Sequence, residues 1–318
     1  MRAVLMVLAL AFLVAPRARA QCECPAEGAL VIGHRGAGTN GAGEALPENT
    51  IESAQQAFSE GAGMVEIDVQ LTADGAVVLM HDDTVERTTD GAGCVSALTL
   101  AEIRALDAGG GVGVPTLAEL LAAVDGAVNI EIKLHESDEC PAQDLDALVA
   151  AVVADVRAAS AEDRVLVSSF ALEVLRTLRA SAPSIEIGYL STSADDIDVA
   201  SAEGFEAIHL FGALANARTV QRAHDAGLRV NAWTLNSARD IERALSAGAD
   251  GVITDDAALA IATRGAFCEA YVCPGADAGV DGGTAAPSGG CGASGGGSAP
   301  IATLLVLGAL LVFRRQRR

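Results

Sequence analysis

Residues 31–83 read VIGHRGAGTNGAGEALPENTIESAQQAFSEGAGMVEIDVQLTADGAVVLMHDD, and the fold prediction starts from this stretch. The apolar runs Leu30–His34 and Met64–Leu71 are rich in β-branched residues, which is typical of buried strands. Between them, Thr50–Glu60 has the composition of a helix. A strand, a helix and a second strand in this order indicate a βαβ unit with parallel strands.

The same alternation continues along the chain. Further strands are predicted at Val128–Leu134, Arg164–Ser168, Ile185–Leu190, Ala207–Phe211, Leu228–Leu235 and Asp250–Thr254. Further helices are predicted at Thr116–Val124, Ala142–Ala159, Leu172–Ala180, Ala194–Glu203, Asn216–Ala226, Ser237–Ala247 and Asp256–Arg264. Eight βα units of this kind predict an α/β fold, a closed (β/α)8 TIM barrel.

One irregularity follows the second strand. Residues 72–75 read TADG, a tight turn, and the apolar run Val77–His81 comes directly after it, so we expect a small hairpin here. Its end returns His81 to the end of strand two. The glycine-rich segment Gly91–Gly113 is predicted to be a loop over the same face.

The two ends of the chain differ from this central part. Residues 1–20 have the early arginine, apolar core and A-x-A pattern of a signal peptide, so the predicted barrel domain covers residues 21–273. Residues 274–300 form a predicted Gly/Ala/Ser-rich linker. Residues 301–318 are apolar and then arginine-rich, but the apolar run is shorter than the roughly 20 residues of a membrane-spanning helix.

That C-terminal segment resembles sorting tails of the MYXO-CTERM type. The resemblance implies an exported protein at the cell surface, in the outer membrane or periplasm, or secreted after the tail is processed. A simple membrane anchor is the alternative. In either case contact with a membrane is expected only through the tail.

Composition limits the partners. The formal charge of −21 and the pI near 4.5 argue against binding to nucleic acid or anionic lipid, because both need a basic surface. We expect a monomer that acts on a small molecule. Any phosphate group must then be bound by a few local cations.

The chain has seven cysteines, and export predicts disulfides rather than zinc ligands. Cys94 and Cys140 follow strands two and three and are expected to pair on the face where those strands end. The other predicted group consists of Cys22, Cys24, Cys268 and Cys273, at the opposite end of the barrel, where a bridge would join the start of the domain to its end.

Charged residues occur at a spacing of two within two predicted strands. Glu66 and Asp68 share one side of strand two, and Glu131 and Lys133 share one side of strand three. The opposite register would bury the charges under the helices, so all four are expected to face the barrel mouth. Three converging carboxylates predict a divalent ion, Ca²⁺ or Mg²⁺. The alternative is a salt-bridge network in which Arg35 and Lys133 alone neutralise them.

Two histidines lie at the same face. His34 ends the first strand and His81 arrives on the hairpin. Imidazoles on either side of a metal-bound phosphate provide the general acid and general base that phosphodiester cleavage requires. A purely structural role is the usual alternative for a single histidine at a strand end.

Eight motifs together resemble the glycerophosphodiester phosphodiesterase family. They are HRG, PENT, EIDVQLTADG, VVLMHD, PTLAELL, NIEIK, NAWTLN and GADGVITDD, in this order between Val31 and Ala262. The resemblance implies a TIM barrel that hydrolyses glycerophosphodiesters to an alcohol and glycerol 3-phosphate with a divalent metal. It implies an acid/base pair of His34 and His81, metal ligands Glu66, Asp68 and Glu131, and phosphate contacts from Arg35 and Lys133. Trp233 is expected to pack on the glycerol or the leaving alcohol.

Other residues of these motifs have predicted structural roles. Asn49 is expected to cap the first helix, Glu48 to hold the loop before it, and Asp255 or Asp256 to cap the last helix. Two alternative functions remain. A phospholipase acting on intact lipids needs an exposed apolar rim, which a chain with 3% aromatic residues is not expected to provide. A non-catalytic surface binding module has no reason to keep buried charges.

Overall fold

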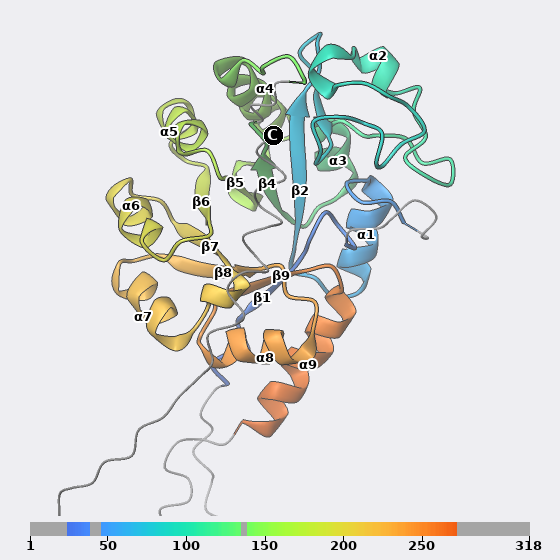
Figure 1. Ribbon diagram of the computed structural model, residues 1–318. Coiled ribbons are helices and arrows are strands. Elements are labelled where there is room, and N and C mark those ends of the chain that lie inside the picture. Colours follow the sequence, from blue (N-terminus) through green and yellow to red (C-terminus); the bar gives the residue numbers. More distant parts are fainter. Residues whose placement is uncertain (1–23, 39–45, 135–138, 272–318) are drawn as a thin grey trace, which may run out of the picture. The chain divides into compact units, whose positions relative to one another are not determined.

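Eight parallel strands form a closed barrel in the computed structural model, which describes residues 24–38, 46–134 and 139–271 (Figure 1). Their order is β1-β9-β8-β7-β6-β5-β4-β2, and β1 pairs with β2 to close the ring. The strands are β1 (Leu30–Gly33), β2 (Met64–Leu71), β4 (Ala127–Ile132), β5 (Val165–Ser169), β6 (Glu186–Ser191), β7 (Ala207–Phe211), β8 (Arg229–Trp233) and β9 (Gly251–Thr254). The predicted TIM barrel is confirmed.

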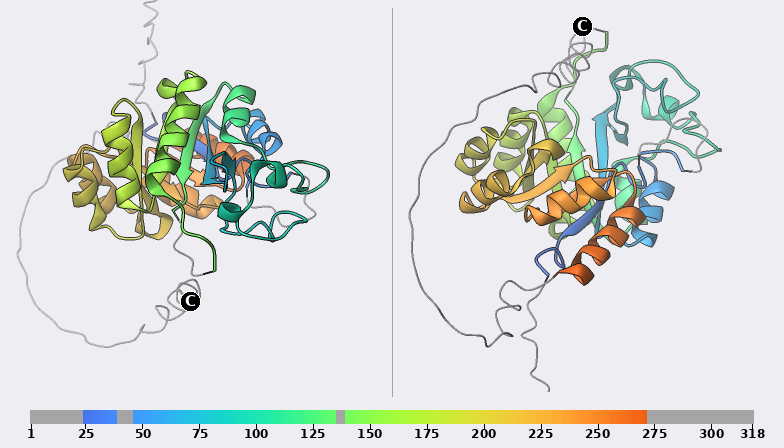
Figure 2. Two further views of the ribbon diagram at one scale, coloured as in Figure 1. Left: turned by 90° about the horizontal axis from the view of Figure 1, so that it is seen from above. Right: turned by 60° about the horizontal axis from the view of Figure 1, so that its bottom comes forward.

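Helices surround this barrel, as the view from above shows (Figure 2). They are α1 (Ile51–Ser59), α3 (Leu117–Ala123), α4 (Leu145–Ala158), α5 (Leu172–Ser181), α6 (Asp196–Ala202), α7 (Ala217–Asp225), α8 (Ala238–Ser246) and α9 (Ala257–Ala270). Short 3₁₀ turns occur at Glu162–Arg164 and Gly212–Leu214. Most of the helices begin with a side-chain cap, for example Thr116 with Glu119 at α3 and Ser237 at α8.

The predicted hairpin is present. Strand β3 (Val77–Leu79) pairs antiparallel with the second half of β2. The turn at residues 72–75 is closed by a hydrogen bond from the Gly75 N–H to the Thr72 carbonyl, and Gly75 has a φ of +83°. Only glycine adopts this angle without strain, so the DG pair determines where the chain reverses.

The segment after β3 is more ordered than the loop that the sequence predicted for Gly91–Gly113. It contains a 3₁₀ turn (Val95–Ala97) and the short helix α2 (Leu100–Ile103), whose start is capped reciprocally by Thr99 and Glu102. The segment has a small core of its own, formed by Val78, Met80, Val85, Val95, Ile103 and Val114. It projects from one side of the barrel (Figures 1 and 2).

The register of β2 and β4 places their charged residues as expected. Asp68 lies opposite Glu131, and Glu66 lies opposite Asn129. The intervening apolar residues Val65, Ile67, Ile130 and Ile132 belong to the main core, which is continuous with the apolar faces of the helices. Because side chains alternate along a strand, the carboxylates point into the barrel.

Two disulfides match the predicted arrangement. Cys94 pairs with Cys140, and Cys24 at the start of the domain pairs with Cys268 in α9. Among the described residues, no helix is long and apolar enough to cross a membrane. The predicted signal peptide (1–20), linker (274–300), tail (301–318), Cys22 and Cys273 lie outside the described residues.

Candidate active site

A cavity of about 130 Å³ opens at the carboxyl ends of the barrel strands. On the same measure about 10–15 Å³ is enough for one water molecule, so the cavity admits a larger guest. The structure brings nearly all predicted site residues to it. Those that line it are His34, Arg35, Glu66, His81, Glu131, Lys133 and Trp233. Asp68 lies beside them, buried against Lys133.

The three carboxylates form one cluster. Glu66, Asp68 and Glu131 are all buried, and one oxygen of each lies within 4.8 Å of the others. Lys133 contacts two of them: its Nζ donates to Glu131 Oε1 and lies 3.0 Å from Asp68 Oδ1. Burial disfavours the charged form of Asp68, but Lys133 and other nearby cations hold the pKa of its carboxyl well below the usual range. Asp68 is therefore ionised.

Glu66 differs from its two neighbours. Its Oε2 accepts a hydrogen bond from the Arg35 N–H at 2.9 Å, whereas its Oε1 is buried without a partner among the described residues. Burial and the adjacent Asp68 raise the pKa of Glu66 to about 8. The predicted salt-bridge network therefore satisfies Asp68 and Glu131 but not Glu66. An orphaned carboxylate oxygen within an all-oxygen cluster fits a hard divalent cation such as Ca²⁺ or Mg²⁺.

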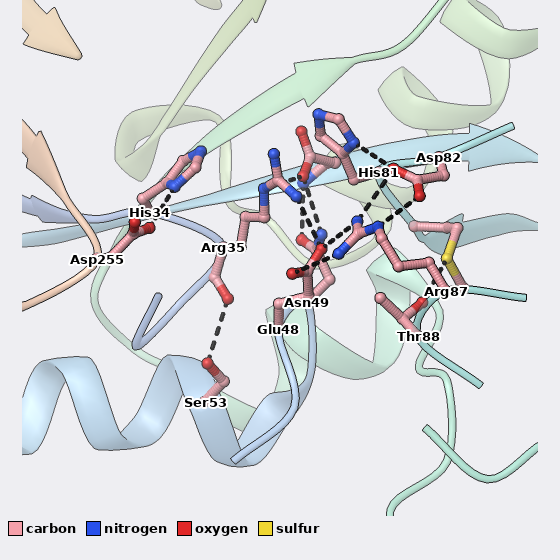
Figure 3. Close-up of polar contacts among 12 residues, drawn as sticks. His34, Arg35, Glu48, Asn49, Ser53, His81, Asp82, Arg87, Thr88 and Asp255 are labelled. Atoms are coloured by element: carbon pink, nitrogen blue, oxygen red, sulfur yellow. Dashed lines mark hydrogen bonds and ion pairs between the residues drawn. The ribbon is translucent and has the colours of Figure 1, made fainter. Parts of the chain in front are cut away.

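Arg35 follows β1 in a constrained backbone. Its φ is 52°, which non-glycine residues rarely adopt, and this conformation points its N–H at Glu66. The guanidinium NH1 donates to Glu48 Oε1 at 2.8 Å, and Nε lies 3.4 Å from Asp68 Oδ2. Glu48 and Asp68 therefore hold the Arg35 guanidinium at the edge of the cavity. Figure 3 shows Arg35 beside Glu48.

His34 is oriented by Asp255, a residue 221 positions later in the chain. Its Nδ1 donates to Asp255 Oδ1 at 2.6 Å, so the neutral ring carries its lone pair on Nε2. Asn236 holds Asp255 in place, donating from Nδ2 to Oδ2 at 2.5 Å and accepting from the Asp255 N–H at 2.9 Å. Burial opposes protonation, yet the bond to Asp255 and the nearby Glu66 raise the pKa of His34 above 6.5.

The two aspartates predicted as alternative caps of the last helix have separate roles. Asp256 caps α9 by accepting from the Leu259 N–H at 2.8 Å. Asp255 is not the cap, because it directly follows β9 and its side chain points instead to His34, the residue that directly follows the neighbouring strand β1. Sequence adjacency provides no signal for this pair, because the two strands meet only when the barrel closes.

His81 has a carboxylate partner of its own in the adjacent Asp82. Nδ1 of His81 lies 2.7 Å from Asp82 Oδ1. Burial favours the neutral acid, but hydrogen bonds from His81 and Arg87 hold the pKa of Asp82 well below its usual range. Arg87 continues the network by donating to Glu48 at 2.7 and 3.0 Å, and Glu48 also accepts from Arg35 (Figure 3). This chain of contacts connects His81 on the hairpin to Arg35, which lies just after β1.

Asn49 does not cap the first helix, contrary to the sequence prediction. The cap is Thr50, whose hydroxyl accepts from the Ser53 N–H at 3.2 Å. Asn49 has a φ of 57° and turns its amide inward, where it donates to Asp68 Oδ2 and accepts from the Asp68 N–H, both at 2.9 Å. The motif at 47–50 therefore supports the acidic cluster directly rather than only the helix.

The opposite side of the mouth is apolar. Trp233, at the end of β8, packs edge-on against Phe170 and Phe211, with ring centroids 5.4 and 5.5 Å away. Its indole Nε1 donates to the His209 carbonyl at 2.8 Å, which fixes the ring. Phe170 and Phe211 are 46% and 45% exposed. The expectation that no apolar rim exists is wrong, because these few aromatic residues, separated in sequence, lie at or directly after the ends of β5, β7 and β8 and meet at Trp233.

Known proteins share both the sequence motifs and the barrel. A sequence profile described as the glycerophosphoryl diester phosphodiesterase family matches residues 34–259. A glycerophosphodiester phosphodiesterase of Caldanaerobacter subterraneus is 37% identical over 243 residues, which cover 71% of this chain and 94% of that protein.

Solved structures show the same similarity. A putative glycerophosphoryl diester phosphodiesterase from Silicibacter pomeroyi has 30% identity and a TM-score of 0.67, and the match covers 77% of this chain and 98% of that one. A phosphodiesterase from Oleispira antarctica, solved in complex with the product sn-glycerol-3-phosphate, has 29% identity and a TM-score of 0.66. That match covers 74% of this chain and 96% of the other.

Proposed function

The chain belongs to the glycerophosphoryl diester phosphodiesterase family and to that enzyme class, and we propose that it uses a divalent ion and two histidines to hydrolyse small glycerophosphodiesters. The products are an alcohol and sn-glycerol 3-phosphate. The observation that carries the proposal is the acidic cluster at the cavity that also holds the two Asp-supported histidines. One oxygen of Glu66 in this cluster has no hydrogen-bond partner among the described residues.

The proposed metal ligands are Glu66, Asp68 and Glu131. A bound Ca²⁺ or Mg²⁺ would supply Lewis-acid polarisation of a phosphoryl oxygen and offset the negative charge of the cluster. Among the described residues, this cluster is the group of His, Cys, Asp and Glu side chains close enough to hold such an ion. The acidic character of the whole chain makes the local cations essential for binding an anionic phosphate.

Arg35 and Lys133 are the proposed phosphate contacts. Both line the cavity and both are fixed by carboxylates, Arg35 by Glu48 and Lys133 by Asp68 and Glu131. Burial lowers the pKa of Lys133, but Asp68 and Glu131 raise it overall, so the ammonium group stays charged. A fixed positive charge at this position stabilises the charge that develops on the equatorial phosphoryl oxygens.

His34 and His81 are the proposed acid and base. One imidazole accepts a proton from the nucleophile, which is water or the neighbouring glycerol hydroxyl, as the new P–O bond forms. The other donates a proton to the departing alkoxide as the old P–O bond breaks. If the glycerol hydroxyl attacks, the first product is a cyclic phosphate, and water must open this ring in a second step to give sn-glycerol 3-phosphate. Asp255 and Asp82 keep the Nδ1 protons in place, so each ring works through Nε2.

Product identification tests the proposal. The protein is incubated with glycerophosphocholine, and sn-glycerol 3-phosphate, choline and phosphocholine are quantified. We expect equal amounts of sn-glycerol 3-phosphate and choline, and loss of both with EDTA. Release of phosphocholine, or an undiminished rate in EDTA, would contradict the proposed reaction.

A second candidate activity is supported by the aromatic rim. Phe170 and Phe211 are large and exposed beside the cavity, and such side chains favour an apolar ligand. The same chemistry acting on a phospholipid would leave the lipid tails against this rim. Hydrolysis of lysophosphatidylcholine, compared with glycerophosphocholine under equal conditions, distinguishes the two activities.

Export remains part of the proposal. Disulfides persist in oxidising compartments, so the Cys24–Cys268 and Cys94–Cys140 bridges support a location outside the cytoplasm. Fractionation of cells producing the full-length chain, with detection of the protein in each fraction, tests this location and the predicted processing of residues 1–20 and 301–318.

A further inference from the structure

Asn129 is a buried side chain that the proposed mechanism does not use. It lies in β4, is 1% exposed and lines the floor of the cavity. Neither its Nδ2 nor its Oδ1 has a hydrogen-bond partner among the described residues. Buried amides nearly always have partners, because leaving a donor and an acceptor unmade is costly.

The neighbours of Asn129 do not explain it. Glu66 lies opposite on β2 and Glu131 lies two residues later on β4, on the same side of the strand. A cation among the carboxylates would take Glu66 Oε1 as a ligand and could also take Asn129 Oδ1, but it would leave Asn129 Nδ2 without a partner, because an amide N–H is a donor only. A leucine at this position has a similar shape and no polar atoms, so it would avoid the free-energy cost of burying an unpaired amide.

The unmet groups of Asn129 specify the chemistry of their partner. A single group that serves both atoms at once accepts from Nδ2 and donates to Oδ1. A hydroxyl group does both. An ionised phosphate oxygen only accepts, and a quaternary ammonium or an alkyl chain does neither.

The rest of the cavity determines which part of a substrate reaches this amide. The wall opposite the charged side contains Phe170, Leu190 and Trp233. The Trp233 indole N–H already donates to the His209 carbonyl, so this wall suits an apolar group and not a polyol. Arg35 and Lys133, the proposed phosphate contacts, lie on the charged side. The polyol part of the substrate is left for the floor.

We infer that the Asn129 amide binds a hydroxyl group of the glycerol moiety and selects glycerol phosphates against alkyl phosphates of the same size. The inference rests on the proposed function, since it assumes that a phosphate ester occupies this cavity. Asn129 is a binding residue for the polyol and takes no part in proton transfer.

Two matched esters test the inference by binding alone. sn-Glycerol 3-phosphate and n-propyl phosphate have the same carbon and phosphate skeleton, and only the first has free hydroxyls. We expect calorimetry to give the wild-type protein a preference of roughly 10- to 100-fold for glycerol 3-phosphate, the range for one hydrogen-bonded hydroxyl in a buried site. Asn129→Leu is expected to remove most of this preference.

Ser168→Ala is the matched control. The Ser168 hydroxyl is also buried without a partner among the described residues, on the adjacent strand β5 and opposite Glu131, but it is not among the residues that line the cavity. We expect the preference between the two esters to be the same in this variant as in the wild type. Thermal unfolding is measured for each variant, and Asn129→Leu should retain the wild-type melting temperature or exceed it.

The outcomes separate the possible errors. An unchanged preference in Asn129→Leu, or a lowered melting temperature with both esters weakened equally, would overturn the inference in favour of a structural role. If Asn129→Leu does not fold, Asn129→Ser, which keeps a smaller donor and acceptor, must retain part of the preference. Failure of the wild type to bind either ester would contradict the proposed function itself. It would also contradict the inference about Asn129, which assumes that a phosphate ester binds in this cavity.

Discussion

The two sides of the barrel mouth are built on opposite principles. The side formed by β1, β2 and β4 contains buried charges that are stable only in combination, such as Asp68 between Lys133 and Arg35. The side formed by β5, β7 and β8 presents Phe170, Phe211 and Trp233, which pack on one another and need no partner of opposite charge. In the proposed function, the chemistry is assigned to the first side and contact with the leaving group to the second.

The comparison also shows how differently the two sides tolerate change. On the charged side each residue satisfies another, so removing one leaves a buried charge unpaired. On the aromatic side, exposed rings lose contact area and little else. We expect large effects from substitutions on the charged side and small ones on the aromatic side.

The largest effect is expected for the two histidines. His34→Ala and His81→Ala should each slow turnover by about 10²- to 10⁴-fold, the usual contribution of one general acid or base. His224→Ala is the control, because His224 also pairs with an aspartate, Asp250 at 2.8 Å, but lies on the surface in α7. Initial rates on glycerophosphocholine measure the effect, and equal losses in all three variants would refute the assignment.

Asp255→Asn is expected to cost less, about 10- to 100-fold, because it disturbs only the orientation of His34. The hydrogen bond to Asp255 raises the pKa of His34, so the substitution should also move the limb of the pH–rate profile due to His34 to lower pH. The dependence of kcat/KM on pH, measured across the neutral range, provides the test. A lower rate with an unshifted profile would count against the pairing.

Metal affinity should depend on pH through Glu66. The folded-state pKa of about 8 lies above the ordinary value of 4.5, so in the metal-free protein the group favours the folded state at low pH, and this stabilisation is lost as the pH rises to about 8. A cation needs the ionised form and displaces one proton. Apparent Ca²⁺ affinity should therefore rise roughly tenfold per pH unit as the pH approaches this pKa from below. Glu66→Gln should bind weakly with no such slope, and a similar slope in that variant would contradict the role of Glu66.

The smallest effect is expected on the aromatic side. Phe170→Ala and Phe211→Ala should raise KM for glycerophosphocholine by roughly 2- to 5-fold and leave turnover nearly unchanged, because only contact area is lost. Steady-state kinetics on glycerophosphocholine and lysophosphatidylcholine show whether the loss is greater for the lipid. A turnover as slow as that of the histidine variants, in either phenylalanine variant, would contradict this division. It would mean that the aromatic side takes part in catalysis and not only in contact with the substrate.

Local patterns in the sequence are sufficient to predict most of the fold. The eight strands and the inward register of Glu66, Asp68, Glu131 and Lys133 follow from period-two alternation in β-rich runs. The pairing of Cys94 with Cys140 follows from their places after the ends of neighbouring strands. Each of these inferences needs only residues close in sequence or the general geometry of a barrel.

The missed features depend on contacts that form only when the chain closes. Asp255 meets His34 because β9 pairs with β1, and Asn49 meets Asp68 because its own backbone turns to a positive φ. The aromatic rim arises from Phe170, Phe211 and Trp233, which are far apart along the chain. Average composition suggests too few aromatic residues for a rim, but it contains no information on where they gather.

The proposed metal site is tested most directly by a stoichiometric metal titration combined with product release. The protein is stripped with EDTA at a pH near the pKa of Glu66, Ca²⁺ or Mg²⁺ is added back in known amounts, and bound metal and sn-glycerol 3-phosphate are measured in the same samples. We predict one ion per chain in the Glu66, Asp68 and Glu131 cluster, with activity rising in parallel with occupancy and both lost in Glu131→Gln. Full activity of the stripped protein, or an ion bound equally well by Glu131→Gln, would contradict a catalytic metal at this cluster.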